Sequence, residues 1–236
     1  MRNGRWTLLA LLAGLAAAEP TPFVADYRML RGSLHVADAQ FRLAPSADRG
    51  WTLTSVSEPV GVFRLITDDV IVETSSFRDG GEGYVPLSYH YEQRNSSKDR
   101  DERYAFDWAT GRVAGVARGE SLAFEVPTGT LDPLLLRLAV GEALARGALP
   151  AAYTVVERRK LRSYELKRTE PATLKVPAGE FAVEGVVRVS EDGKKTTRFL
   201  YAPALGWTPV VMEHAEADKA TIRLELTKLA RDPAPR

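Results

Sequence analysis

The sequence is 236 residues long and almost balanced in charge, with 32 Lys and Arg residues against 31 Asp and Glu residues. This balance argues against nucleic acid or an anionic membrane surface as a partner, because both select strongly basic proteins. The chain contains no cysteine, which excludes disulfide bonds and the lipidated cysteine of a bacterial lipoprotein, so the fold depends on its hydrophobic core.

The first eighteen residues have the pattern of a secretory signal peptide. Arg2 and Arg5 precede an apolar run over residues 6–17, which is followed by small residues up to Ala18. This run is shorter than the roughly 20 residues that a membrane-spanning helix needs, and its basic start and small-residue end are what a signal peptidase recognises. We therefore expect cleavage between Ala18 and Glu19, export to the periplasm, and a mature protein that is not integral to the membrane.

Residues 23–124 are divided by turn residues into short runs in which apolar and polar side chains alternate. An alternation of period two predicts antiparallel strands with one buried face. The expected strands in this part are Phe23–Arg28, Leu34–Leu43, Trp51–Val56, Asp69–Phe77, Tyr89–Arg94 and Glu102–Trp108. The last two flank a charged turn and are expected to form a hairpin with aromatic side chains on one face.

One helix interrupts this pattern, at about residues 133–146. Asp132 is a favourable N-cap, Pro133 suits the first helical position, and Gly147 ends the helix. Apolar residues surround its first turns almost completely and leave Arg137 and Glu142 as the expected solvent-facing groups. The sequence therefore predicts a buried helix that packs against the concave face of the sheet.

Strands resume after the helix. They are expected at Ala152–Glu157, Arg162–Thr169, Ala172–Val176, Phe181–Val189, Thr196–Ala202, Thr208–His214 and Thr221–Leu229. The proline-containing tail, 230–236, is expected to be disordered. Because no linker separates the two groups of strands, residues 19–229 are expected to form one mainly β domain: a strongly curved antiparallel sheet, or an incompletely closed β-barrel, wrapped around one central α-helix.

The sequence has no pattern typical of catalysis, of a metal site or of a cofactor site. The three histidines, His35, His90 and His214, are far apart and lack metal-ligand spacing, and neither a serine nucleophile elbow nor a phosphate-binding glycine loop occurs. We therefore expect a protein that is not an enzyme and carries no cofactor or metal. A hydrolase that uses distant carboxylates stays open as an alternative, and two carboxylates about 5 to 10 Å apart in a groove would indicate it.

Two groups of residues are candidates for binding. The first consists of aromatic and apolar side chains that are expected either to form sheet core or to line an apolar cavity: Tyr89, Tyr91, Phe106, Trp108, Leu135 and Leu138. The second is a basic cluster at a strand connection, expected either to be solvated or to contact an anionic ligand, a lipid head group or a protein partner: Arg158, Arg159, Lys160 and Arg162.

Several segments resemble the bacterial family known as domain of unknown function 3108 (DUF3108). They are residues 86–91 (PLSYHY), 106–108 (FDW), 132–133 (DP), 177–181 (PAGEF) and 201–210 (YAPALGWTPV). The resemblance implies an exported envelope protein and supplies no catalytic residue. The expected architecture is also similar, more distantly, to the periplasmic lipoprotein carriers LolA and LolB. This chain lacks the lipidated cysteine of LolB, so a soluble carrier is the closer analogue.

The predicted function is therefore a soluble periplasmic carrier that holds a lipid or acyl chain inside a curved sheet. Burial of an acyl chain contributes about 0.8 kcal/mol per methylene group, so the cavity itself would supply the affinity. The alternative is a non-enzymatic envelope accessory protein that binds a protein partner through an exposed strand edge or through the loop 158–162.

Overall fold

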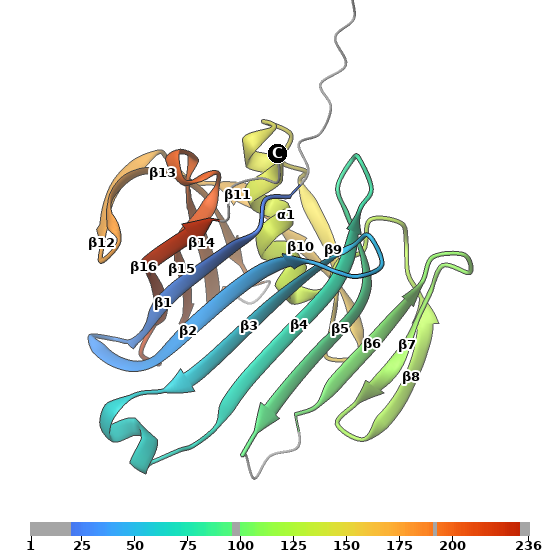
Figure 1. Ribbon diagram of the computed structural model, residues 1–236, viewed down its shortest axis with the longest axis horizontal. Helices are drawn as coiled ribbons and strands as arrows, with labels where there is room; N and C mark the ends of the chain where they lie inside the picture. The colour runs from blue at the N-terminus through green and yellow to red at the C-terminus, as the bar shows by residue number, and fades with distance from the viewer. Residues whose placement is uncertain (1–19, 96–99, 191–192, 232–236) are drawn as a thin grey trace, which may run out of the picture.

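The structure, a computed structural model, describes residues 20–95, 100–190 and 193–231 (Figure 1). Within this part of the chain a large antiparallel β-sheet curves around helix α1 (Pro133–Ala145). The two end strands of the sheet, β8 and β11, do not pair with each other, so the sheet is open. The predicted fold class is confirmed. The expected leader, residues 1–18, lies outside the described residues.

The large sheet has fourteen strands in the order β11-β13-β14-β15-β16-β1-β2-β3-β4-β5-β6-β7-β8, with β12 paired to β13. The strands before the helix are β1 (Phe23–Arg31), β2 (Leu34–Pro45), β3 (Trp51–Pro59), β4 (Val70–Asp79), β5 (Tyr84–Arg94), β6 (Glu102–Asp107), β7 (Arg112–Ala117) and β8 (Glu120–Glu125). Those after it are β11 (Lys167–Arg168), β12 (Ala172–Val176), β13 (Gly179–Val189), β14 (Lys195–Ala202), β15 (Thr208–Glu216) and β16 (Ile222–Arg231). β9 (Ala152–Glu157) and β10 (Lys160–Glu165) form a separate hairpin. The structure also has two short 3-10 helices, η1 (Gly61–Leu65) and η2 (Pro203–Leu205).

Some boundaries differ from the sequence prediction. β7 and β8 were not predicted individually, because β7 buries only Val113 and Ala117 and its alternation is weak. The single strand expected at Arg162–Thr169 is divided between β10 and β11. β16 reaches Arg231, whose Nη2 donates a hydrogen bond to the Leu205 carbonyl at 2.7 Å, so the strand continues two residues into the segment that was expected to be a disordered tail.

The helix fills only one half of the curved sheet. Neighbouring strands are antiparallel, so the connections after β1, β3, β7 and β15 lie together at one end, the lower end in Figure 1. α1 starts beside Ser75, in the middle of β4, and its last turn lies near the opposite end, where Arg146 Nη2 donates to the Glu82 carbonyl at 3.3 Å. The concave face near the lower end is therefore not covered by the helix.

A buried carboxylate fixes the start of the helix to the sheet. Asp132 Oδ1 accepts hydrogen bonds from the backbone N–H groups of Leu134 and Leu135 at 3.0 and 2.8 Å, and its Oδ2 accepts one from the Ser75 hydroxyl at 2.6 Å. Asp132 and Ser75 are both completely buried. Burial raises the pKa of Asp132 to about 6, against the opposing effect of these hydrogen bonds. One side chain thus caps the helix and attaches it to β4.

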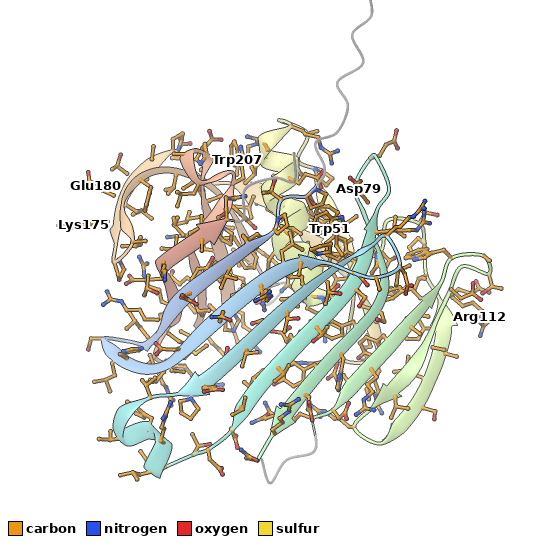
Figure 2. The ribbon with its side chains drawn as sticks, viewed as in Figure 1. Trp51, Asp79, Arg112, Lys175, Glu180 and Trp207 are labelled. Atoms are coloured by element: carbon orange, nitrogen blue, oxygen red, sulfur yellow. The ribbon has the colours of Figure 1, made fainter. Side chains whose placement is uncertain are left out.

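The second half of the helix is fixed by a close contact between Gly141 and the backbone of Trp207. A Cβ atom at Gly141 would lie 2.7 Å from the Trp207 carbonyl oxygen and 3.0 Å from the Tyr201 ring. Figure 2 shows Trp207 beside the upper part of α1. The Tyr201 hydroxyl donates to the Arg137 carbonyl at 2.7 Å. Glycine is therefore required here by packing, although it costs about 1 kcal/mol relative to alanine inside a helix.

The helix is buried as predicted, but neither residue that was expected to face solvent is freely exposed. Glu142 is one of them: its side chain is only 19% exposed and lies 3.5 Å from Arg146. Leu134, Leu135, Leu136 and Val140 are each at most 3% exposed, so apolar contacts surround the first turns. Arg137, which was expected to face solvent, instead turns toward the concave face and lies within ion-pair distance of a carboxylate on β4. The sequence pattern did not show that the uncovered part of the sheet would offer a polar partner inside the fold.

The segment that leads into the helix also pairs with the β9–β10 hairpin. Leu131, just before the N-cap, forms a parallel bridge with Val155 of β9. The Leu131 N–H donates to the Thr154 carbonyl, and the Val156 N–H donates to the Leu131 carbonyl, both at 2.9 Å. The hairpin is thus hydrogen-bonded to the segment before the helix and does not join the large sheet as further strands.

We predict that Asp132→Ala lowers the free energy of unfolding by about 2 kcal/mol, because it removes the helix cap and leaves the buried Ser75 hydroxyl and two backbone N–H groups without their acceptor. Chemical denaturation measures the change. Asp132→Asn keeps an oxygen for the cap and is the matched control, and equal losses in both variants would contradict the capping role.

The pH dependence of stability gives a second test of the same carboxylate. Its pKa of about 6 in the folded protein exceeds the ordinary value of 3.8, so between about pH 4 and pH 6 the folded state keeps a proton that the unfolded chain releases. The contribution of Asp132 to stability is therefore full below pH 4 and is lost as the pH rises through 6, by an amount on the order of 3 kcal/mol. We expect Asp132→Asn to gain stability relative to the wild type over this window, and parallel pH profiles would contradict this.

Gly141→Ala is expected to destabilise the protein by about 1 to 3 kcal/mol, in spite of the higher helix propensity of alanine. The added methyl group would overlap the backbone carbonyl of Trp207, which a rotamer change cannot relieve. Thermal unfolding of the variant measures this loss. An unchanged or higher melting temperature would show that the helix does not need this close approach.

Candidate functional site

A cavity of about 1030 Å³ occupies the uncovered part of the concave face. Its walls come from the inner faces of the large sheet, the first turns of α1 and the β9–β10 hairpin. Pockets for small molecules in proteins measure about 300 to 1,000 Å³, so this cavity is at the upper end of that range.

One row of side chains crosses the floor of the cavity. Phe41, Ser55, Glu73 and Tyr91 are direct partners across β2, β3, β4 and β5, and therefore point to the same concave face. All four line the cavity, as does Ser57, two residues along β3. The two serines are small, and they leave space on the floor that larger side chains would fill.

Apolar side chains form much of the remaining wall. Those that line the cavity from strands, from the helix and from the segment after β10 include Met29, Ile71, Leu136, Leu166, Phe199, Met212, Ile222 and Leu224. Met29, Ile71, Phe199, Ile222 and Leu224 are only partly buried, although their partners in the sheet place them on the concave side. Inward-facing apolar surface has thus been left in contact with solvent, which costs free energy until something covers it.

The helix contributes one charge to the cavity, and this charge is paired. Arg137 lies 3.4 Å from Glu73 and 5.6 Å above the Phe41 ring. Glu73 also accepts a hydrogen bond from the Tyr89 hydroxyl at 3.0 Å. Burial, followed by the neighbouring Glu73, raises the pKa of Tyr89 well above its ordinary value, so the phenol stays protonated as a donor.

The β9–β10 hairpin brings further charged groups to the opposite wall. Arg162 and Arg158 lie 3.3 and 3.7 Å from the carboxylate of Glu157, which also accepts a hydrogen bond from the Tyr164 hydroxyl. Arg188, on β13, lies 3.7 Å above the centre of the Tyr164 ring. All five side chains line the cavity.

The structure brings three of the sequence-predicted site residues to this cavity. They are Tyr91, Arg158 and Arg162. Tyr89 points to the same concave face as Tyr91 but does not line the cavity: its ring stacks on Tyr104 of β6 at 5.9 Å and its hydroxyl contacts Glu73.

The other predicted residues lie away from the cavity wall. Phe106 and Trp108 stack on each other at 5.7 Å, and Trp108 Nε1 donates to the Pro86 carbonyl at 2.6 Å. Leu135 is completely buried and Leu138 packs partly buried against the core, while their neighbour Leu136 turns toward the cavity.

The two remaining basic residues also lie off the wall. Arg159 pairs with Glu120 on β8, and its backbone N–H donates to the Tyr104 hydroxyl at 3.3 Å. Lys160 is exposed and does not line the cavity. The hairpin turn therefore divides the basic cluster between the cavity and the edge of the sheet.

Sequence reasoning did not identify Ser55, Glu73, Arg137 or Arg188 as site residues. A signal for Glu73 was present, since it occupies an inward position of β4 between Ile71 and Ser75 in an otherwise alternating run. No comparable signal exists for Arg188, because only the packing of the β9–β10 hairpin places Tyr164 beneath it.

A second hollow, of about 730 Å³, lies on the convex face. Asp26, Gln40 and Val56 form one row of direct partners in it, and Arg28, Asp38 and Glu58 form the next. Pro177, in the β12–β13 hairpin, overhangs this hollow. Figure 2 shows Lys175 and Glu180 on the same hairpin, at the outer side of the molecule. This hollow is smaller than the concave cavity and lies on the solvent-facing side of the sheet, so the concave cavity is the stronger candidate.

The described residues contain no cluster of three or more His, Asp or Glu side chains arranged to hold a metal ion. In the same part of the chain, no helix is both long enough and apolar enough to cross a membrane.

Comparison with known proteins places the chain beside families without an assigned activity. A family profile described as "Protein of unknown function (DUF3108)" matches residues 24–227. Among solved structures, the β-barrel-like protein of domain of unknown function DUF1849 from Brucella abortus is similar with a TM-score of 0.58 and 11% identity, over 90% of this chain and 98% of that one. A candidate lipoprotein from Parabacteroides distasonis aligns over 90% and 96% of the two chains at 10% identity, but its TM-score of 0.33 supports no argument. No curated protein matches the sequence.

We predict that Glu73→Ala lowers the free energy of unfolding by about 2 kcal/mol, because it leaves the Arg137 guanidinium and the buried Tyr89 hydroxyl without their acceptor. Glu73→Gln keeps the acceptor oxygen and the side-chain volume, so its loss should be about half as large. Urea denaturation compares the two variants. A loss below about 0.5 kcal/mol in Glu73→Ala would contradict a structural role for this carboxylate.

Proposed function

We propose that this chain, which belongs to the DUF3108 family of proteins of unknown function, is a non-enzymatic carrier of an apolar ligand. The ligand would be a lipid or another molecule with an acyl chain, and the chain would lie in the concave cavity. The sequence of residues 1–18 supports a periplasmic location for this activity.

The observation that carries the proposal is the uncovered apolar surface inside the curved sheet. Met29, Ile71 and Leu224 point toward the interior and line the cavity, yet they are only partly buried. Soluble domains normally cover such concave apolar surface with their own side chains, and a concave pocket that combines apolar side chains with placed polar groups is a common form of ligand site.

The energetics agree with a single acyl chain. About twelve buried methylene groups contribute about 10 kcal/mol, against an association cost of at least about 4 kcal/mol. The remaining free energy of about 6 kcal/mol corresponds to a Kd in the tens of micromolar. A longer chain or an additional polar contact would bind more tightly.

The arrangement of the cavity carboxylates favours binding over hydrolysis. Glu73 is held by Arg137 and Tyr89, and Glu157 by Tyr164 and two arginines. Each carboxylate is therefore held by partners within the fold, whereas a glycosidase needs two carboxyl groups that flank the bond to be broken.

A second candidate function, docking to a protein partner, is favoured by one observation. Val62, Leu65 and Ile66, in and just after η1, are 66%, 89% and 76% exposed. Three large apolar side chains on one connection form a small exposed patch of the kind found in protein interfaces. If docking is the function, simultaneous substitution of the three residues by serine should abolish recovery of a stoichiometric partner from envelope extracts. If the protein is a carrier instead, the same substitution should leave lipid binding unchanged.

We predict that Ser57→Trp weakens binding of an acyl-chain probe at least tenfold, because the indole would occupy the floor of the cavity. The measurement is displacement of the fluorophore N-phenyl-1-naphthylamine by dodecanoate, together with native mass spectrometry of protein purified without detergent. Thr54→Trp is the matched control, since Thr54 lies on the same strand but pairs with Arg42 and Thr74 on the opposite face.

The outcome against the carrier function is equally specific. Wild-type protein that binds neither the fluorophore nor dodecanoate, and that carries no bound mass from the periplasm, would exclude it. Equal binding by the two tryptophan variants would show that the ligand does not occupy the concave cavity.

A further inference from the structure

Three arginines converge on the part of the cavity formed by the β9–β10 hairpin. Arg158 and Arg162 come from the hairpin and Arg188 from β13, and all three line the cavity. Arg158 and Arg162 share one carboxylate, that of Glu157. Arg188 has no carboxylate partner among the described residues, although it is only partly exposed. Positive charge therefore exceeds negative charge at this point.

Arg188 is oriented in a way that leaves its hydrogen-bond donors available. Its guanidinium stacks on the Tyr164 ring, 3.7 Å from the centroid. A stacked guanidinium keeps its N–H groups in the plane of the fork, where they can donate to a carboxylate or phosphate from the side. The phenol below is engaged as a donor to Glu157, so the ring is a fixed support for the arginine.

The arginines of this group are close to one another. Arg162 Nε lies 3.3 Å from the Glu157 oxygen that accepts the hydrogen bond of the Tyr164 hydroxyl, and Arg188 lies 3.7 Å above the ring of the same tyrosine. Arg162 and Tyr164 are two residues apart on β10 and share a face of the strand. One small anionic group can thus contact more than one of these cations.

The backbone of the hairpin turn is strained at Arg158 and Arg159. Arg158 and Arg159, the two residues between β9 and β10, have φ values of 49° and 68°. Two-residue turns of this type strongly favour Asn-Gly or Gly-Gly, because positive φ costs a residue with a Cβ atom roughly 1 kcal/mol or more. Arg158 and Arg159 instead occupy both positions, and the first of them lines the cavity.

This basic group lies beside the apolar wall. Leu161 and Leu166 flank the hairpin arginines, and Phe199 lines the cavity from β14, the neighbour of the strand that carries Arg188. Lys195 also lines the cavity, as do two further acidic residues: Glu165, which is exposed, and Glu213, which forms an ion pair with Arg223. The cavity thus combines an apolar wall with a cationic corner at the hairpin.

We propose that Arg158, Arg162 and Arg188 form a head-group site, so that the ligand is an amphipathic molecule whose acyl chain lies on the concave floor and whose carboxylate or phosphate binds at the hairpin. This inference rests on the proposed carrier function and names the chemical class of its ligand. Arg188 is the principal contact, because it brings free donors without an acidic partner among the described residues.

The test compares dodecanoate, dodecyl phosphate and dodecanol as competitors of N-phenyl-1-naphthylamine, on the wild type and on Arg188→Gln. We expect the wild type to bind at least one anionic probe about tenfold or more tightly than dodecanol, as charge-assisted hydrogen bonds produce. Arg188→Gln should lose this preference and keep its affinity for dodecanol. The anion that is preferred distinguishes a carboxylate head group from a phosphate one.

Two controls keep the result interpretable. Arg198→Gln removes a charge from the outer face of β14, where Val187 and Glu213 are opposite Arg198 on the neighbouring strands. This variant should change no affinity. Arg188→Lys keeps the charge without the planar fork and should give an intermediate preference. Equal binding of charged and neutral probes by the wild type would overturn the head-group site while leaving the cavity as a carrier site. Equal loss of all three probes in Arg188→Gln would also overturn it, and absence of binding by every probe would instead exclude the carrier function.

Discussion

The placement of the helix depends on one buried carboxylate. Asp132 satisfies the first free N–H groups of α1 and accepts the Ser75 hydroxyl of β4, so the start of the helix is fixed at the middle of the sheet. From there the helix runs toward one end, and Gly141 lets it approach the backbone beyond β14 closely. Because α1 has only thirteen residues, it cannot cover the rest of the concave face. The cavity is the direct consequence of where this short helix begins.

The same geometry explains the division between core and cavity. On the side filled by the helix, aromatic and aliphatic side chains such as Tyr201 and Leu135 are completely buried. On the other side, the inward positions of β3 carry Ser55 and Ser57, which are too small to fill the space that the helix leaves. A larger residue there would extend the core toward the lower end. The sheet is thus filled by the helix at one end and encloses the cavity at the other, with the β9–β10 hairpin forming part of the cavity wall.

Much of the fold was predictable because its signals are local. Alternation with period two marks most strands, and the sequence Asp132-Pro133 marks the helix start, since both depend on neighbouring residues alone. The candidate site was predictable only in part. The aromatic positions Tyr89 and Tyr91 share a strand face. Tyr91 lines the cavity, whereas Tyr89 stacks on Tyr104 and does not line it. Local patterning cannot separate these two outcomes, because both side chains point inward and differ only in how far the helix reaches over them.

The sequence by itself determined the class of fold, the position of the helix, the absence of cysteine and the leader pattern, because each follows from composition or from short-range order. Only the tertiary structure decided that the sheet stays open, that Arg137 turns inward to Glu73, and that Arg188 of β13 stacks on Tyr164 of β10. Arg137 and Glu73 are 64 positions apart in the chain, and Arg188 and Tyr164 belong to different sheets. The contacts that define the candidate site are therefore set by how the strands and the hairpin meet in space, which no spacing along the chain records.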